Sequence, residues 1–414
     1  MDKIDTGDTA WMLLCTFLVI LMTIPGLQLF YGGMVRKKNI LSVMMQSLAL
    51  CAVVSVLWFA LGYSLAFGTG NAWIGDLSRA FLPGLADSFD KPFTLGAGTD
   101  AAVATTIPES VFFLYQLAFA IITPAVVTGA VVDRMKFTAM LVFFSLWSLV
   151  VYAPLVHWVW SPLGWLNRMG VADFAGGTVV EINAGICALV CALVVGRRMG
   201  WGNDNMAPHN LAYAVAGGAL LWVGWFGFNA GGALVAGGRA GMAVLATQMA
   251  ASGATLGWAF LEWVWRGKPT VLGAISGAVA GLVAVTPAAG FLTPGPALLL
   301  GVLAGMVCMW ASTWLKFRLR YDDSLDAFGV HGVGGIVGML FTGLFADGRL
   351  TDGAYAGGLA LLGVQAFASL VAIAYSGIGT LVLLRVTEAL VGLRVTSEEE
   401  RQGLDESLHG ESLG

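Results

Sequence analysis

Two titratable side chains lie inside apolar, glycine-rich stretches of this sequence, Glu181 and His331. A charge near the middle of a bilayer costs about 2.5 to 3.5 kcal/mol on insertion scales, so such residues are by default functional and face the interior of a helix bundle. Carboxyl and imidazole groups in that setting bind substrates or pass protons. An aspartate precedes each of them, Asp173 before Glu181 and Asp326 before His331. These matched positions favour a functional His331 over a core histidine bonded to a backbone carbonyl.

Other polar residues in the apolar stretches have structural explanations that compete with functional ones. Asp173 precedes Gly-Gly-Thr at the start of a predicted helix, where a carboxylate accepts bonds from free backbone N–H groups, so we favour structural support over direct ligation. Glu262 lies near a helix end, where it snorkels or pairs with Arg266. His157, close to Trp160, fits an interfacial aromatic belt as well as a site.

The composition indicates what holds these residues in place. Charged residues make up 11% of the 414-residue chain, against about 25% in an ordinary soluble domain. Apolar residues reach 58% and the mean hydropathy is +0.81. So little charge cannot cover the water-facing surface of several soluble domains, which predicts a polytopic membrane protein of the all-α class. The net charge of -4 and the lack of a long basic run exclude a nucleic-acid partner.

Eleven stretches are long and apolar enough for a bilayer core of about 30 Å, which needs about 20 helical residues. They cover residues 9–32, 40–67, 107–132, 137–160, 177–196, 209–230, 241–264, 269–288, 296–315, 328–346 and 357–390. The last is the longest and must tilt or bend.

The loops between these stretches predict the orientation. Cations gather in alternate connections, which the positive-inside rule places in the cytoplasm. These cations are Arg36, Lys37, Lys38, Arg134, Lys136, Arg197, Arg198, Arg266, Lys268, Lys316, Arg318 and Arg320. The loop 68–106 carries four aspartates against one arginine and one lysine. We therefore expect the N-terminus outside and the C-terminus inside.

The two segments with titratable residues also predict an internal symmetry. The spans divide into five, five and one, and Glu181 and His331 fall in the fifth and the tenth. An odd number of spans per half inverts the second half, which is typical of inverted repeats with a site at the membrane midplane. We predict repeats over about 9–197 and 208–347, an extra helix over 357–390, and a tail over 391–414. The 56 glycines predict close helix packing.

Cysteines and the first residues add little. The five cysteines lie in apolar stretches, where a free Cys behaves as a small hydrophobe. They are Cys15, Cys51, Cys187, Cys191 and Cys308. Cys187 and Cys191 share a helix face, but no acid or His cluster of ligand spacing accompanies them, so no metal site and no disulfide framework is expected. The start of the chain shows no secretory signal pattern.

Several motifs resemble the Amt/Mep branch of the Amt/Mep/Rh ammonium transporters, over nearly the whole chain. The motifs are Ile24-Pro-Gly-Leu-Gln-Leu-Phe-Tyr-Gly-Gly, Asp173-Phe-Ala-Gly-Gly-Thr-Val-Val, Ile182-Asn-Ala-Gly, Gly224-Trp-Phe-Gly-Phe-Asn-Ala-Gly, Phe328-Gly-Val-His-Gly-Val, Gly392-Leu-Arg-Val, Gly403-Leu-Asp and His409-Gly-Glu. The resemblance implies the eleven-helix fold with inverted repeats, a homotrimer with one narrow pore in each subunit, and no enzyme activity or cofactor.

The resemblance also implies roles for individual residues. Phe119, Trp160 and Trp225 would frame an outer vestibule that recruits ammonium through their π faces, supported by Asp173. Phe119 and Phe228 would form a stacked gate below it. His331 matches the second of two pore histidines, and Tyr31 and Thr286 match positions beside the pore.

The sequence departs from the family pattern at two positions. Glu181 replaces the first pore histidine, as in some fungal members, and Gly232 replaces a vestibule serine. The glycine removes a hydroxyl that could accept from the cation, so we expect weaker outer binding. Glu181 and His331 remain a competent relay, because neutral acid with neutral imidazole and carboxylate with imidazolium differ by one proton transfer.

The function expected from the resemblance is electrogenic ammonium uptake across the cell membrane. Ammonium would lose its proton, ammonia would pass Phe228, and the proton would travel through Glu181 and His331. The substrates expected are ammonium and ammonia, with methylammonium as a further candidate. The alternative is an ammonium receptor that signals through its tail. A membrane-embedded enzyme is disfavoured, because the sequence contains neither a nucleophile set nor a cluster of metal ligands. The tail and the vestibule aromatic residues disfavour a gas channel like those of the Rh branch.

The polar, acidic tail predicts a regulatory element at the cytoplasmic face. Gly403 and Asp405 are placed to form a turn or cap against the bundle. In bacterial relatives this region couples subunits and meets a PII-type signal protein, which the resemblance suggests as a partner here.

Overall fold

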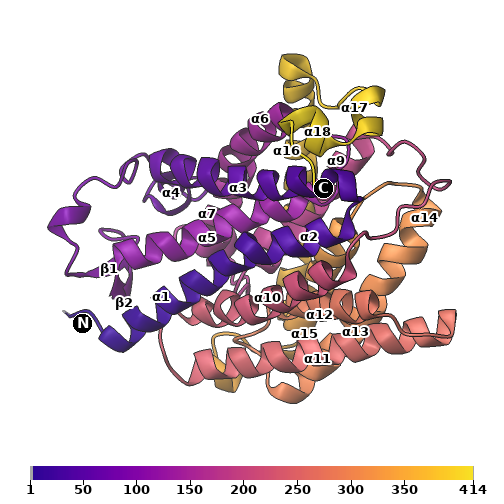
Figure 1. Ribbon diagram of the computed structural model, residues 1–414. Helices are drawn as coiled ribbons and strands as arrows, with labels where there is room; N and C mark the ends of the chain where they lie inside the picture. Colours follow the sequence, from indigo (N-terminus) through magenta and orange to yellow (C-terminus); the bar gives the residue numbers. More distant parts are fainter. Residues whose placement is uncertain (1–2, 414) are drawn as a thin grey trace.

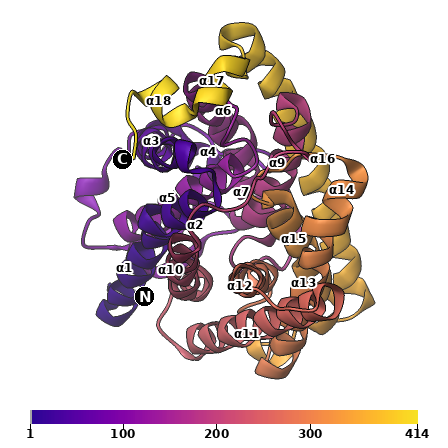
Figure 2. The same cartoon turned by 45° about the vertical axis from the view of Figure 1, so that its right-hand side comes forward.

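The computed structural model describes residues 3–413 as a bundle of long helices whose axes run roughly parallel or antiparallel (Figure 1). The N-terminus and strands β1 (Pro92–Leu95) and β2 (Val103–Pro108) lie at one end of the bundle. The short helices α17 (Ser397–Gln402) and α18 (Leu404–His409) lie towards the other end, which we call the tail end. Figure 2 shows the same helices turned by 45°, with α11, α12 and α13 grouped on the side away from the tail.

Ten of the predicted spans coincide with helical segments that are long and apolar enough to cross a membrane. They are Thr6–Met34, Lys37–Phe67, Glu109–Thr128, Phe137–Arg168, Gly177–Val195, Leu211–Ala233, Gly238–Arg266, Pro294–Leu319, Phe328–Phe345 and Leu359–Val391. The eighth predicted span, 269–288, is a shorter apolar helix over Val271–Val285. It ends before Pro287, which has no N–H to continue the helix.

The α-helices within these segments have the following bounds. They are α1 (Thr6–Leu21), α2 (Gln28–Met34), α3 (Ile40–Leu57), α4 (Tyr63–Phe67), α5 (Glu109–Thr128), α6 (Phe137–Trp147), α7 (Ala153–Trp160), α8 (Trp165–Arg168), α9 (Asn183–Val195), α10 (Leu211–Ala230), α11 (Gly238–Arg266), α12 (Val271–Val285), α13 (Pro294–Trp310), α14 (Lys316–Leu319), α15 (Val333–Phe345) and α16 (Leu359–Val391). Several spans contain a π-helical turn, and such turns are frequent at functional sites. Two of them hold the titratable residues, Gly177–Ile182 before α9 and Phe328–Gly332 before α15.

The mostly helical fold includes one short hairpin that the sequence analysis did not predict, where β1 and β2 pair antiparallel. Phe93 and Leu95 alternate with more exposed neighbours and are only 7% and 8% exposed. This period of two fits a strand with one buried face. A backbone bond from Asp5 N–H to the carbonyl of Thr106 then ties the N-terminus to the hairpin, with 2.9 Å between nitrogen and oxygen.

Glycines let the two site-bearing helices touch. A Cβ added to Gly185 of α9 would lie 2.1 Å from the backbone nitrogen of Gly332, and one added to Gly335 of α15 would lie 2.8 Å from Cβ of Glu181. No side chain fits in these gaps, so the backbones approach closely, as in other membrane helix pairs rich in small residues.

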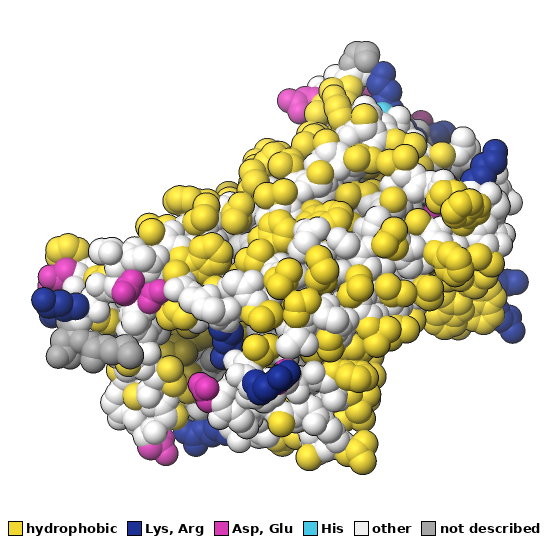
Figure 3. Space-filling view, turned by 90° about the horizontal axis from the view of Figure 1, so that it is seen from below, with side chains coloured by type: hydrophobic (Ala, Val, Ile, Leu, Met, Phe, Trp, Pro, Cys, Tyr) yellow, Lys and Arg dark blue, Asp and Glu magenta, His cyan; other side chains and the backbone are white. Residues whose placement is uncertain are grey.

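Apolar side chains cover much of the middle of the face shown in Figure 3, with Lys, Arg, Asp and Glu mostly towards its ends. This distribution suits a bilayer, because charges stay near water.

The predicted cationic residues meet the tail and buried acids at the tail end. Arg198 donates to Asp322, with 2.7 Å between Nη2 and Oδ1, and both side chains are buried. Burial by itself would raise the pKa of the Asp322 carboxyl, but the hydrogen bonds and charge of Arg198 outweigh it and hold that pKa below its ordinary value. In the tail, Arg394 pairs with Glu400 at 2.8 Å and Lys38 donates to the carbonyl of Glu400 at 3.0 Å.

Candidate functional site

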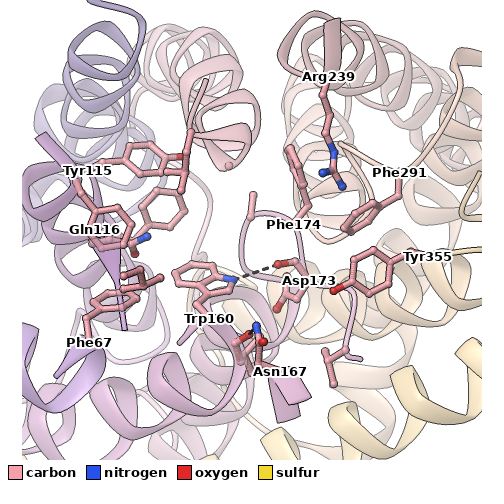
Figure 4. A pocket seen from close by; sticks show the side chains of 18 residues that line it. Phe67, Tyr115, Gln116, Trp160, Asn167, Asp173, Phe174, Arg239, Phe291 and Tyr355 are labelled. Atoms are coloured by element: carbon pink, nitrogen blue, oxygen red, sulfur yellow. Dashed lines mark hydrogen bonds between the residues drawn. The ribbon is translucent and has the colours of Figure 1, made fainter. Parts of the chain in front are cut away.

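A cavity of about 210 Å³ opens between the helices near the hairpin end, and we call it the outer cavity. Its lining residues are Phe67, Leu95, Phe112, Tyr115, Gln116, Phe119, Val159, Trp160, Asn167, Val171, Asp173, Phe174, Ala175, Gly232, Leu234, Arg239, Phe291 and Tyr355. Figure 4 shows aromatic side chains on both sides of the cavity, with Tyr115, Phe67 and Trp160 on one side and Phe174, Phe291 and Tyr355 on the other. The cavity thus offers a cation two sets of π faces.

Two buried phenylalanines close the floor of the outer cavity. The rings of Phe119 (α5) and Phe228 (α10) lie 4.3 Å apart between centroids, and each side chain is 1% exposed. Their planes are tilted by 40° rather than parallel, so the predicted gate is a tilted contact. Trp160 meets Phe119 edge to face, with centroids 5.6 Å apart. The two phenylalanine rings are thus buried and in contact with each other.

Trp225, which was expected in the vestibule, is not among the residues that line the outer cavity. It lies three residues before Phe228 on α10, almost one turn deeper. Its ring is 5.2 Å from that of Phe228 and 6.5 Å from that of His331, and it is nearly parallel to the imidazole. Thr286 accepts the indole N–H at 2.9 Å and fixes the ring. Trp225 therefore connects the gate to the titratable pair.

Glu181 and His331 are in direct contact, with 2.7 Å between Oε2 and Nδ1. Glu181 is fully buried and His331 is 6% exposed. The second carboxyl oxygen, Oε1, has no hydrogen-bond partner among the described residues. A proton can sit on either side of the short bond, so the pair can hold and transfer it within one contact.

Asp173 supports the helix that carries Glu181. Its Oδ1 accepts from the backbone N–H groups of Gly176 at 2.8 Å and Gly177 at 2.5 Å, and its Oδ2 accepts from the N–H of Thr178 at 2.8 Å. The hydroxyl of Thr178 also donates to Oδ2, at 2.5 Å. These donors are the unpaired N–H groups of a helix start, as predicted from the sequence.

The structural counterpart of Asp173 is Asp323, and the expected counterpart Asp326 is not. Asp323 accepts from the N–H of Phe328 at 2.7 Å, at the start of the helix that carries His331. Asp326 instead pairs with Lys316 at 2.6 Å. The spacing could have shown this, because Asp173 precedes Glu181 by the same eight residues as Asp323 precedes His331.

A smaller cavity of about 60 Å³ lies on the other side of His331. Tyr31 and Asp326 line it together with His331. The hydroxyl of Tyr31 donates to the carbonyl of Val126 at 2.9 Å, so this side chain is fixed beside the cavity. The pair thus borders this smaller cavity through His331, and rings in contact connect it to Phe119 in the lining of the outer cavity.

The other predicted residues lie away from the two cavities and from the rings that join the outer cavity to His331. Asp405 accepts from the N–H of Ser42 at 2.7 Å and so caps the start of α3, next to Gly403 at φ +113°. Glu262 pairs with Arg266 at 3.4 Å, one of the two alternatives considered from the sequence.

His157 is fully buried, and both ring nitrogens contact backbone carbonyls, those of Ala66 at 2.9 Å and Asn71 at 2.6 Å. These contacts tie α7 to α4 and to the loop that follows it. Among residues 3–413, no group of three or more His, Cys, Asp or Glu side chains could hold a metal ion.

Helices of membrane-spanning length, two buried phenylalanine rings in contact below a cavity, and a buried acid–imidazole pair fit a polytopic membrane transport protein. The model of the Ammonium Transporter Family matches residues 10–413. An ammonium transporter of Bacillus subtilis is 46% identical over 98% of both chains.

Two solved structures share the fold. The crystal structure of Candida albicans Mep2 has a TM-score of 0.87 and 33% identity, covering 96% of this chain and 88% of that one. A structure described as a sensor Amt protein has a TM-score of 0.88 and 28% identity, covering 97% and 98%. The chain belongs to the ammonium transporter family, a family of multi-pass membrane transport proteins.

Proposed function

We propose that this protein takes up ammonium electrogenically, with ammonia and the proton following separate routes past the gate. The observation that carries the proposal is the buried contact between Glu181 and His331, which lies on a continuous series of rings leading from the outer cavity. That series runs from Trp160 through Phe119 and Phe228 to Trp225 and the imidazole of His331.

Recruitment takes place in the outer cavity. A cation over the faces of Trp160 and Phe119 gains about 0.5 to 2 kcal/mol, the larger value when water is excluded. At position 232 the glycine offers no hydroxyl to accept from the cation. Binding therefore depends on the rings, and we expect it to be weak.

Loss of a proton at the gate is what discriminates ammonium from potassium. Phe119 and Phe228 leave a dry contact, and a bare ion in a medium of low dielectric constant pays most of its hydration energy. Ammonium avoids this cost by giving up a proton and passing as ammonia. Potassium has no proton to give up and is rejected.

Glu181 and His331 then relay the proton. The two states of the pair, acid with imidazole and carboxylate with imidazolium, differ only in the position of a proton across the contact of 2.7 Å. Oε1 of Glu181 has no protein partner, so it is free to accept the proton that ammonium gives up, and ammonia is the other product of this transfer. His331 also lines the smaller cavity, where the proton leaves.

The variant Glu181→Gln tests this relay. An amide keeps the shape and the hydrogen bond to the imidazole but cannot carry a proton, so ammonium pulses on proteoliposomes should no longer give a sustained current. Glu262→Gln is the matched control, because Glu262 is 2% exposed and outside the path. Potassium pulses control for ion leakage. An unaltered ammonium current in Glu181→Gln would refute the relay.

The remaining parts of the proposal concern topology and assembly. We include eleven spans, two inverted repeats, an outer N-terminus, a cytoplasmic tail and a homotrimer. The two site-bearing helices support the repeats, because each has an aspartate, a π-helical turn and then a 13-residue α-helix. A PII-type partner would meet the tail end, where α18 lies against α3.

A second candidate function is an ammonium receptor with little or no turnover. The similarity to a sensor Amt protein supports it. A current that scales with the number of proteins per liposome and persists through the pulse would establish transport. A brief transient that does not scale, together with measurable binding, would establish the receptor.

A further inference from the structure

An arginine side chain, Arg239, lines the outer cavity. Of its described lining residues, only Asp173 and Arg239 carry a charge. The guanidinium carbon of Arg239 lies 5.3 Å from the ring centroid of Phe174 and 5.1 Å from that of Phe291. Figure 4 shows this side chain reaching into the space between the two rings. One of the two sets of π faces is therefore already used by the protein's own cation.

Helix stability does not explain this arginine. Arg239 lies in the first turn of α11, where the helix dipole disfavours a positive charge. Its Nε donates to the carbonyl of Gly290 at 3.3 Å, and we find no ion pair with a carboxylate among the described residues. A snorkelling arginine would direct its charge to the surrounding water. Here the charge is held by two rings inside the cavity, which compensates the unfavourable position.

The glycine at position 232 belongs to the same arrangement. A Cβ at Gly232 would lie 2.5 Å from the carbonyl oxygen of Phe174. The segment that carries Phe174 therefore packs directly onto this glycine. With a larger residue at 232, Phe174 would have to move away from its place beside Arg239.

We propose that Arg239 is a specificity-determining residue for ammonium recruitment, an inference that rests on the proposed function. Its fixed charge offsets that of Asp173, so the charged side chains of the lining give the cavity no net attraction for cations, and only the π faces hold ammonium. Its occupation of the Phe174 and Phe291 faces leaves ammonium only the side formed by Trp160 and Phe119. The outer cavity is thereby set to bind ammonium weakly, and the affinity depends on ionic strength.

Three variants test the charge separately from the packing. Arg239→Met removes the charge and keeps an unbranched apolar side chain, whereas Arg239→Lys keeps the charge and loses the planar stacking. Arg168→Met is the matched control, because Arg168 is 49% exposed, does not line the cavity and pairs with Asp100. The measurements are the ammonium concentration for half-maximal initial current and the maximal current, at low and high salt.

The expected result is a lower half-saturating concentration in Arg239→Met, by about two- to thirtyfold at low salt. This is the range that Coulomb's law gives for unit charges several ångströms apart as the effective dielectric constant falls from about 80 to about 20. The difference from wild type should narrow at high salt, because screening weakens both charges' effects. Arg239→Lys and Arg168→Met should stay near the wild type.

Two outcomes would overturn the proposal. One is an unchanged half-saturating concentration in Arg239→Met. The other is the same change in Arg239→Met and Arg239→Lys, which would assign the effect to packing. Arg239→Gln replaces Arg239→Met if the latter unfolds, as monitored by its thermal transition.

A binding measurement separates this proposal from the proposed function. Tryptophan fluorescence of the purified protein titrated with ammonium reports binding without transport, because Trp160 lies in the cavity. If the wild type gives no sustained current, transport fails while the affinity shift of Arg239→Met is still measured. If current is sustained but neither readout shifts in Arg239→Met, the role of Arg239 fails while transport stands.

Discussion

The two helix-capping aspartates should respond differently to the same substitution, asparagine for aspartate. Asp173 and Asp323 precede Glu181 and His331 at equal spacing, yet their surroundings differ. Both oxygens of Asp173 are used, by donors from Gly176, Gly177 and Thr178. Asp323 uses Oδ2 for the N–H of Phe328, while its buried Oδ1 has no partner among the described residues.

The cost of each substitution follows from these contacts. In Asp173→Asn the amide NH₂ faces the N–H of Thr178, and a buried donor without an acceptor costs about 1 to 3 kcal/mol. The bonds that remain also lose the assistance of the negative charge, about 1 kcal/mol in total. We expect a loss of about 3 kcal/mol. In Asp323→Asn the carbonyl keeps the bond to Phe328, and the NH₂ replaces an oxygen that already lacks a partner. One unpaired buried group is exchanged for another, so the change should stay within about 1 kcal/mol of zero.

The pH dependence distinguishes the second variant further. Burial, followed by the charge of Asp326, raises the pKa of the Asp323 carboxyl to about 6. Its pKa in the unfolded chain is about 3.9. The folded state therefore binds this proton more tightly, and the group adds stability as the pH falls from about 7 to about 4, by an amount on the order of 2 kcal/mol. Asp323→Asn lacks this gain, so the wild type should become the more stable of the two as the pH falls.

Equilibrium unfolding in mixed micelles, titrated with a denaturing detergent at pH 7 and pH 5, measures all three proteins. The reasoning predicts that Asp173→Asn is the least stable at both values. Equal losses in the two variants, or the reverse order, would refute the claim that hydrogen-bond satisfaction of the cap decides the cost.

Two further predictions concern residues next to the path. Gly232→Ser should not simply supply a binding hydroxyl, because the serine Cβ would lie 2.5 Å from the carbonyl oxygen of Phe174. We expect this overpacking to lower the free energy of unfolding by about 1 to 3 kcal/mol, measured by the same unfolding assay. Tighter ammonium binding with unchanged stability would contradict this. Thr286→Val leaves the indole N–H of Trp225 without its acceptor and should lower the maximal current. Thr342→Val is the control, because the Thr342 hydroxyl contacts only the carbonyl of Gly338 on its own helix, and equal currents in both variants would show that the Trp225 anchor does not matter.

The sequence predicts those features whose free energy depends on the segment itself and not on residues far away in the chain. Ten spans are recovered because length and apolarity set them. Glu181 and His331 stand out because a titratable group in an apolar helix is expensive wherever it points. The cap by Asp173 is likewise local, because acceptor and donors lie within five residues.

Features that depend on depth or on distant partners were not predicted. The sequence does not reveal that Trp225, almost one helical turn from Phe228 on α10, lies beside the ring of His331. The hairpin depends on pairing across a loop. The importance of Arg239 was not predicted, although the sequence indicates it. Arg239 is an arginine in the first turn of an apolar span, at the end where the loops are poor in cations.

Close helix contact explains how Glu181 reaches His331 with a short hydrogen bond. Gly335 lies against Cβ of Glu181, and Gly185 lies against the backbone at Gly332, next to His331. Because the backbones are held this near, Oε2 of Glu181 reaches Nδ1 of His331 at 2.7 Å while both side chains stay buried. A rigid pair can pass a proton without moving. Any opening during transport must then fall to the tilted rings of Phe119 and Phe228, and bulkier residues at Gly335 should disrupt the pair before they disturb the gate.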